Sequence, residues 1–170
     1  MMADTIPIEQ VAPEAVERLL DRAFGTDRHQ RTAYRLRQGT AAIPGLSRAL
    51  LHGGTLAGTI QCWPVRFAGD DGRDMPLVLV GPVAVEPALQ QGGLGRRLML
   101  DMLAAADARG VTTMLIGDPE YYGRFFGYDA AKTSGWRLPG PFEPRRLLAR
   151  GPAIPDGEGI VGPRVAATAD

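Results

Sequence analysis

Residues 77–97 read LVLVGPVAVEPALQQGGLGRR, and this stretch decides the fold. Its apolar first part, residues 77–85, predicts a buried strand that Glu86-Pro87 ends. A glycine-rich turn follows, and a helical pattern then begins with Arg96 and Arg97 in its first turn. Glycine-rich backbone at a helix start presents N–H groups that lack carbonyl partners, and the helix dipole adds partial positive charge there. The stretch therefore predicts a phosphate cradle, and with it a nucleotide-type cofactor.

Several kinds of phosphate loop share such glycines. A Walker loop needs Gly-x-x-x-x-Gly-Lys-Ser/Thr, but the only Lys in the chain is Lys132. The dinucleotide fingerprint needs Gly-x-Gly-x-x-Gly directly after the first strand. Gly93 and Gly95 begin that pattern, but Leu98 takes its third position and the loop comes late in the chain. A glycine-rich turn without any ligand stays open as the simpler interpretation.

Two motifs in this region resemble the GNAT superfamily of N-acetyltransferases. The pattern Val85-x-Pro87-x-x-Gln90-x-x-Gly93-x-Gly95 resembles motif A of that family. Residues 117–128, GDPEYYGRFFGY, resemble its second signature, in which a Tyr opens a short helix that closes in Gly-Phe or Gly-Tyr. Both stand in the family's order, separated by a helix and a strand. The chain is therefore identified as a bacterial-type, single-domain member, on a resemblance that is specific to residues 77–128.

The resemblance implies the GNAT fold, of the α+β class in αβα layers. We expect a twisted mixed β-sheet of about six or seven strands, flanked by helices and splayed at the central strands. Residues 1–170 would form a single N-acetyltransferase domain, a size that one core can hold. Motif A would span residues 77–110 and the second signature residues 111–128, followed by a Pro/Gly-rich C-terminal segment at residues 139–170.

The resemblance also implies acetyl-CoA as the cosubstrate. Backbone N–H groups of the glycine-rich loop would bond the pyrophosphate, and Arg96 or Arg97 would add charge, although a solvated helix face is the simpler interpretation of at least one of them. Backbone at residues 83–85 would pair with the pantetheine arm and point an N–H at the thioester oxygen. Pro82 favours a bulge or lost pairing beside it, because it cannot donate to a ladder. The implied cofactor-binding residues are Val83, Ala84, Val85, Gln90, Gln91, Gly92, Gly93, Leu94, Gly95, Arg96 and Arg97.

The departing thiolate needs an acid, and the resemblance makes Tyr122 the candidate, with Tyr121 as second choice. Gly127 follows Tyr122 by five residues instead of the family's four, so the register between the two tyrosines stays open. The interpretation that both are packing aromatics also stays open. The base is unassigned, because Leu79 stands where some members carry a Glu. Substitutes left open are Asp118, Glu120, Glu86 and His52, and an acetylated Cys62 is a minor alternative.

The motifs together predict an acyl-CoA-dependent N-acetyltransferase that acts on a primary amine by direct attack in a ternary complex. The acceptor would be a small-molecule amine, with a peptide amine as the other choice. Arg28, Arg31 and Arg35 fall on one stripe of a helix expected at residues 28–38, where they would meet an anionic group of the acceptor, unless that stripe is a solvated face. A non-catalytic CoA-binding or sensor module on the same fold stays the alternative, because the Leu79-position Glu is missing and the Tyr spacing is altered.

Composition argues against several other classes of protein. The formal net charge is zero, so no global field would draw nucleic acid or an anionic membrane surface. One Cys excludes an internal disulfide, and two His with one Cys argue against a zinc site, so we expect no metal. The first residues show no signal-peptide pattern, and no apolar run reaches about 18 residues. We therefore expect a cytoplasmic protein; a homodimer is left open.

Local patterns predict the remaining elements. They are a short edge strand at residues 6–8, a helix from Pro13 to Gly25, a hairpin of residues 46–52 and 55–67 around Gly53-Gly54, a helix at 92–109, a strand at 111–116, a helical turn at 145–148, a last strand at 160–161 and a frayed tail at 166–170.

Overall fold

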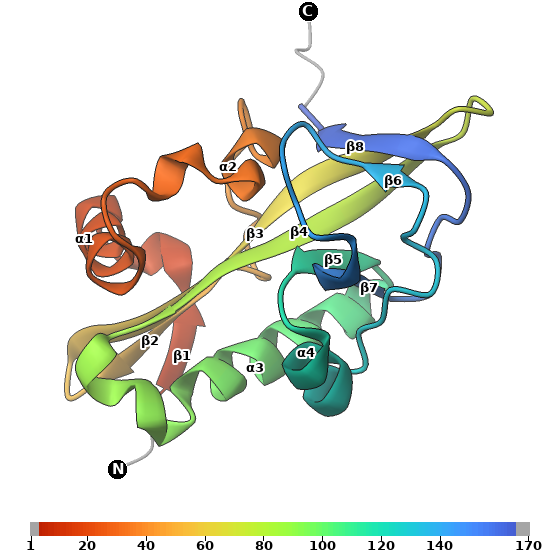
Figure 1. The fold of residues 1–170 in the computed structure, drawn as a ribbon. Helices are drawn as coiled ribbons and strands as arrows, with labels where there is room; N and C mark the ends of the chain where they lie inside the picture. The colour runs from red at the N-terminus through yellow and green to blue at the C-terminus, as the bar shows by residue number, and fades with distance from the viewer. Residues whose placement is uncertain (1–3, 166–170) are drawn as a thin grey trace, which may run out of the picture. The chain divides into compact units, whose positions relative to one another are not determined.

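The computed structural model describes residues 4–165 (Figure 1). The expected tail at residues 166–170 lies outside this range. The strands are β1 Asp4–Pro7, β2 Arg48–His52, β3 Thr55–Gly69, β4 Asp74–Val85, β5 Thr113–Ile116, β6 Trp136–Arg137, β7 Leu147–Arg150 and β8 Gly159–Pro163. The α-helices are α1 Pro13–Phe24, α2 Thr32–Leu36, α3 Leu94–Arg109 and α4 Pro119–Phe126, and the 3-10 turns are η1 Ile8–Gln10, η2 Arg28–Gln30, η3 Pro87–Gly92 and η4 Pro144–Arg146.

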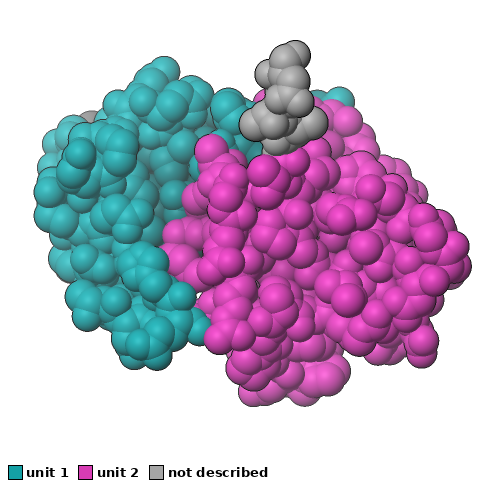
Figure 2. All heavy atoms as spheres, turned by 90° about the horizontal axis from the view of Figure 1, so that it is seen from above, with its two compact units in different colours: residues 1–30, 42–62, 81–108 teal, residues 31–41, 63–80, 109–170 magenta. Residues whose placement is uncertain are grey.

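The strands form one mixed, open sheet. They are hydrogen-bonded in the order β1-β2-β3-β4-β5-β7, and β8 pairs with β3 and with β6. Helices flank this sheet, which confirms the predicted α+β class. The chain divides into two compact units, shown in Figure 2. Unit 1 comprises residues 1–30, 42–62 and 81–108, and unit 2 comprises residues 31–41, 63–80 and 109–170.

Unit 1 packs α1 and α3 on opposite faces of its strands (Figure 1). α1 begins with Pro13 and ends at Gly25, which has φ 89°, as predicted. Its buried residues Val16, Leu19 and Leu20 form a cluster with Ala84 of β4. A β-carbon built on Gly58 of β3 would lie 3.0 Å from Leu98 Cδ1 of α3, so α3 covers the other face. The predicted hairpin is confirmed, because Gly53 and Gly54 have φ 59° and 79°, as a type I′ turn requires.

Unit 2 contains the parallel part of the sheet. β5 is parallel to β4 through the pairs Val78–Thr113 and Leu79–Met114, and antiparallel to β7 along its whole length. β8 runs antiparallel to the end of β3 and parallel to β6. The ladder between β4 and β5 comprises two residue pairs, whereas β4 continues beyond them to Val85.

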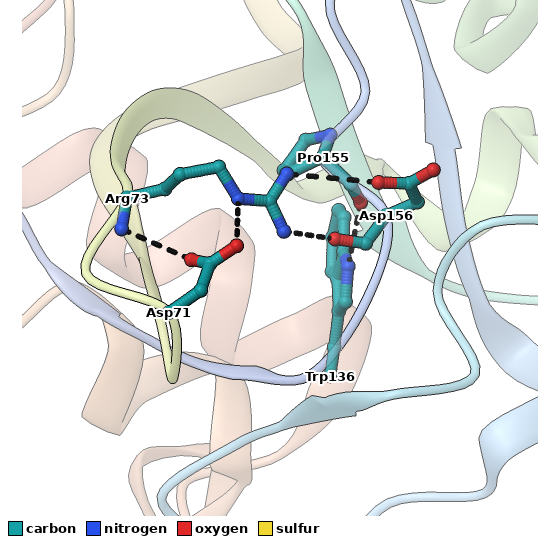
Figure 3. A network of polar contacts seen from close by, with 5 residues as sticks. All are labelled: Asp71, Arg73, Trp136, Pro155 and Asp156. Carbon is teal, nitrogen blue, oxygen red and sulfur yellow. Dashed lines mark hydrogen bonds and ion pairs between the residues drawn. The ribbon is translucent and has the colours of Figure 1, made fainter.

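A polar network secures the turn between β3 and β4 in unit 2 (Figure 3). Arg73 Nε donates to Asp71 Oδ2 at 2.8 Å, and Arg73 Nη2 donates to the Asp156 carbonyl at 2.6 Å. Beside it, Trp136 Nε1 donates to the Pro155 carbonyl at 2.9 Å. These bonds tie the β3–β4 turn and β6 to the segment that precedes β8.

Two predicted elements are wrong. The helix expected at residues 28–38 is interrupted at Arg31, whose extended backbone (φ −71°, ψ 149°) separates η2 from α2. The predicted arginine stripe is therefore absent, and Arg28 is buried, where it pairs with Asp21 and Glu17. The helical turn expected at residues 145–148 ends at Arg146, because β7 begins at Leu147 and pairs with β5.

Candidate active site

The predicted phosphate cradle lies in unit 1, between the end of β4 and the start of α3. The 3-10 turn η3 replaces the irregular turn that we expected, and Gly93 adopts the left-handed conformation, with φ 73° and ψ 16°. The first hydrogen bond of α3 runs from the Arg97 N–H to the Gly93 carbonyl, at 3.1 Å. The amides of Leu94 and Gly95 precede that bond and lie at the positive end of the helix dipole. This is the geometry that binds anions at a helix start.

The glycines keep this helix start uncovered. A β-carbon built on Gly93 would meet no described atom within 4 Å, and one built on Gly92 would meet only Leu94 Cγ at 3.9 Å. At Gly95 it would lie 3.6 Å from Val85 Cγ2, which is ordinary van der Waals contact. Only Gly93 is required by its backbone conformation. Packing against the described residues therefore does not demand the other two glycines, and each leaves room beside the helix start.

Side-chain contacts fix the cradle within unit 1. Asp101 of α3 accepts a hydrogen bond from the Thr5 hydroxyl of β1. The same carboxylate lies 3.7 Å from Arg97 Nε, one helical turn earlier, so the charge of Arg97 is engaged within α3. Arg96 is exposed. The pair therefore agrees with the expectation that at least one of these arginines belongs to a solvated helix face.

The predicted tyrosines lie on α4 in unit 2. Tyr121 is 38% exposed and Tyr122 is half-buried, and their rings make an edge contact with centroids 4.9 Å apart. The Tyr122 ring also lies near those of Phe126 and Tyr128, at 6.1 and 6.4 Å. The hydroxyl of Tyr128 is buried and forms a 2.7 Å hydrogen bond with Thr113, which makes it a structural group.

The surroundings of Tyr122 keep its hydroxyl protonated. Burial raises the pKa of Tyr122, and the nearby Tyr121 and Asp118 raise it further, while Arg146 acts in the opposite direction. A phenol with a raised pKa holds its proton at neutral pH and can donate it. Tyr122 is the more enclosed of the two tyrosines.

The candidate carboxylate bases are all paired with arginines. Glu86 receives Arg22 Nη2 at 2.8 Å, and Asp118 lies 3.3 Å from Arg146 Nε. Glu120 pairs with Arg145, and its own backbone N–H and that arginine lower the pKa of the carboxyl. Glu120 is thereby a weaker proton acceptor. His52 is exposed at the end of β2.

The alternative of an acetylated cysteine is contradicted by burial. Cys62 is fully buried on β3, and burial raises the pKa of its thiol to about 12. The thiolate is the nucleophilic form of cysteine, and at this pKa it does not form at neutral pH.

Sequence reasoning did not single out Gly117 and Arg146 as functional residues. The Gly117 N–H donates to the Arg146 carbonyl at 2.9 Å, and Arg146 Nε lies 3.3 Å from Oδ1 of Asp118, the residue that precedes α4. The Gly-Asp-Pro sequence at residues 117–119 was the available signal, since a Gly directly before a helix start often marks a close approach. Within residues 4–165, no helix is long and apolar enough to cross a bilayer, and no three His, Cys, Asp or Glu side chains gather to hold a metal ion.

A protein-family model matches much of the chain. The sequence model of the acetyltransferase (GNAT) family matches residues 13–128. The comparison with curated proteins found no match.

Solved structures share the fold. The GNAT family N-acetyltransferase YhbS from Escherichia coli, in complex with CoA, is 23% identical over 95% of this chain and 89% of its own, with a TM-score of 0.72. A GNAT family acetyltransferase from Brucella melitensis, in complex with acetyl-CoA, is 22% identical over 96% of both chains, with a TM-score of 0.65. Naa50 from Arabidopsis thaliana, bound to the bisubstrate analogue CoA-Ac-MVNAL, is 14% identical over 89% of this chain and 99% of its own, with a TM-score of 0.55. These likenesses confirm the predicted fold.

Proposed function

The chain belongs to the GNAT family of acetyltransferases, and from that premise we propose that it transfers an acetyl group from acetyl-CoA to the primary amine of a small molecule. One observation of this chain carries the proposal: left-handed Gly93 precedes a sixteen-residue helix, and a β-carbon on Gly92 or Gly93 would meet at most one described atom within 4 Å. That arrangement suits a pyrophosphate. The solved relatives bound CoA or acetyl-CoA, which supports the same cosubstrate here.

In this proposal the residues predicted for the cofactor divide into two groups. The loop from Gln90 to Arg97 holds the pyrophosphate through the amides of Leu94 and Gly95, with exposed Arg96 adding charge. The backbone of Val83–Val85 pairs with the pantetheine arm. The short ladder between β4 and β5 supports the second assignment, because two pairs leave much of β4 without a partner from that ladder.

Acetyl-CoA supplies the activated acyl carbon and a thiolate leaving group. A backbone N–H of the Val83–Val85 segment polarises the thioester carbonyl while the amine nitrogen bonds to the acyl carbon. Tyr122 gives its phenolic proton to sulfur as the C–S bond breaks, and the phenolate regains a proton from solvent. The attacking nitrogen releases its surplus proton to water. The products are the N-acetylated amine and free CoA.

The acceptor must reach this site with its nitrogen unprotonated. Glu86, Asp118 and Glu120 are each paired with an arginine, and the proposal assigns no side chain as the base. Amines whose pKa lies near the working pH are therefore the best acceptors. A peptide α-amino group, with a pKa of about 7.7–8.0, fits that condition better than a lysine side chain at about 10.4. A peptide amine is accordingly the second acceptor class.

Thiol release in the presence of an amine panel tests the proposal. The full chain is incubated with acetyl-CoA and small primary amines or short peptides, and free CoA is measured with a thiol-reactive dye. Calorimetry with CoA gives the affinity independently. Tight CoA binding without thiol release for any amine would favour the non-catalytic sensor module. Equal or better affinity for ATP or NAD would contradict both.

A further inference from the structure

The ring of Tyr122 lies where residue 117 has no room for a side chain. A β-carbon built on Gly117 would come within 2.5 Å of Tyr122 Cε2 and 2.8 Å of Cδ2. Carbon atoms in contact stay about 3.5–4.0 Å apart, so the ring and a methyl group cannot both be present. Gly117 does not have a positive φ angle. The β-carbon would also lie 3.2 Å from Leu115 Cδ1, but the Tyr122 contacts are the closest ones, so they and not the backbone conformation are the main reason for glycine at this position.

Arg146 anchors the two residues that precede α4. Its carbonyl accepts the Gly117 N–H at 2.9 Å, and its Nε lies 3.3 Å from Asp118 Oδ1. The Asp118 carbonyl in turn accepts the N–H groups of Tyr121 and Tyr122, at 3.1 and 2.9 Å. Arg146 thus holds the start of the helix from which Tyr122 projects.

We infer that Gly117 and Arg146 are positioning residues for Tyr122: Gly117 leaves the space in which the ring lies, and Arg146 holds the start of α4 and places a positive charge near it. The inference rests on the proposed role of Tyr122 as proton donor. It concerns residues of unit 2 only. It assigns a role to Arg146 and none to the neighbouring Arg145.

The charges around Tyr122 give Arg146 a second effect. Tyr121 on α4 and Asp118 at its start both raise the pKa of Tyr122, as burial does, and Arg146 from η4 lowers it. The neighbouring rings of Phe126 and Tyr128 carry no charge at neutral pH. A positive charge stabilises the phenolate that Tyr122 becomes when it donates its proton. Removing Arg146 should therefore raise the pKa of Tyr122 further and slow proton donation.

The chain offers a matched control for each residue. Arg145, next to Arg146, is exposed and pairs with Glu120, so Arg145→Gln removes the same charge without touching Gly117 or Asp118. Gly162 on β8 has no positive φ, and a β-carbon there would meet no described atom within 4 Å, so Gly162→Ala adds the same methyl group harmlessly.

The first experiment titrates the Tyr122 hydroxyl by ultraviolet absorbance, as the difference between each protein and its Tyr122→Phe counterpart. Arg146→Gln should raise this pKa and lower kcat at least about tenfold, with unchanged CoA affinity, since its effect belongs to the transition state. Arg145→Gln should change neither. An unshifted Tyr122 titration in Arg146→Gln would overturn the assignment of Arg146. The titration needs no turnover, so it tests the positioning separately from the catalytic role. If Arg146→Gln shifts the pKa of Tyr122 but Tyr122→Phe has a normal kcat, Tyr122 is not the acid and Arg146 still positions it.

The second experiment tests the contact with a double-mutant cycle. Gly117→Ala should lower the melting temperature and kcat, whereas Gly162→Ala should lower neither. In a Tyr122→Ala background, where the ring is absent, Gly117→Ala should no longer destabilise the protein. Equal destabilisation in both backgrounds would show that Gly117 does not serve Tyr122. A Gly117→Ala enzyme with normal kcat, beside a Tyr122→Phe enzyme with reduced kcat, would show the same. If Gly117→Ala alone fails to fold, recovery of a folded protein by Tyr122→Ala supports the contact, and continued failure contradicts it.

Discussion

Replacing Gly95 by Leu should abolish most CoA binding, whereas replacing it by Ala should leave binding intact. Gly95 is the second residue of α3 and does not have a positive φ, so a side chain meets no backbone strain. Its β-carbon would lie 3.6 Å from Val85 Cγ2, which accommodates one methyl group. The three further carbons of Leu would occupy space at the helix start, near the amides that are proposed to hold the pyrophosphate.

The expected changes in stability and in CoA affinity can be estimated for the two variants. Gly95→Ala should raise the stability, because Gly inside a helix is about 0.5–1 kcal/mol less favourable than Ala. For a domain of this size that corresponds to a rise in Tm of roughly 2–4 °C per kcal/mol. Gly95→Leu should weaken CoA binding at least about tenfold, which is about 1.4 kcal/mol.

Calorimetry with CoA on the two folded variants, beside their thermal melts, measures both effects. The Ala variant is the control for helix propensity and for added bulk near Val85. A Leu variant that melts normally and binds CoA with unchanged affinity would remove the cradle from the proposed cofactor site.

Three further predictions test the proton donor and the stability of the core. Tyr122→Phe should lower kcat by about 10²–10⁴-fold with unchanged CoA affinity, because it removes only the acid; a normal Tyr122→Phe beside a disabled Tyr121→Phe would show that the other register is right. Because burial, Tyr121 and Asp118 raise the pKa of Tyr122, its protonated form persists at high pH. The pH profile of kcat should therefore lose no donor activity below the ordinary tyrosine pKa of about 10, and a decline assigned to Tyr122 well below that value would contradict the burial. Thr59→Val should raise Tm, since the Thr59 hydroxyl is buried without a hydrogen-bond partner among the described residues, whereas Thr133→Val should lower Tm, because the Thr133 hydroxyl donates to the Leu147 carbonyl at 2.7 Å.

Local signals sufficed for the elements whose residues carry their own boundaries. Pro13 and Gly25 mark α1, Gly53-Gly54 marks the hairpin, and the apolar run after Pro76 marks the core of β4. The strand β7 was missed because its four residues, Leu147–Arg150, follow a Pro-rich segment and become a strand only through pairing with β5. Pairing with a distant strand leaves no periodic pattern within so short a run.

The candidate site likewise has a part that local sequence predicts and a part that depends on contacts between distant residues. The turn and helix start that form the proposed cradle could be predicted because the glycines and the helical pattern are adjacent in the sequence. The surroundings of Tyr122 could not, because Arg146 reaches Gly117 and Asp118 from a different part of the chain. Arg28 misled the sequence interpretation for a related reason. Inside unit 1 the Arg28 guanidinium forms ion pairs with Glu17 and Asp21, and only the fold brings those carboxylates next to it.

The spacing between Tyr122 and Gly127 can be followed along the hydrogen bonds of α4. At its start α4 is regular, since the Tyr122 N–H donates to the Asp118 carbonyl four residues earlier, at 2.9 Å. At its end the helix closes at left-handed Gly127, whose N–H is shared between the Gly123 carbonyl, four residues earlier, and the Tyr122 carbonyl; the Tyr128 N–H also donates to the Tyr122 carbonyl. The bond from Gly127 to Gly123 is an ordinary α-helical one, so α4 keeps its regular spacing to its last turn. Counting from the start of the helix places Tyr122, and not Gly123, at the proposed position, and this register stays a prediction that the Tyr122→Phe and Tyr121→Phe variants test.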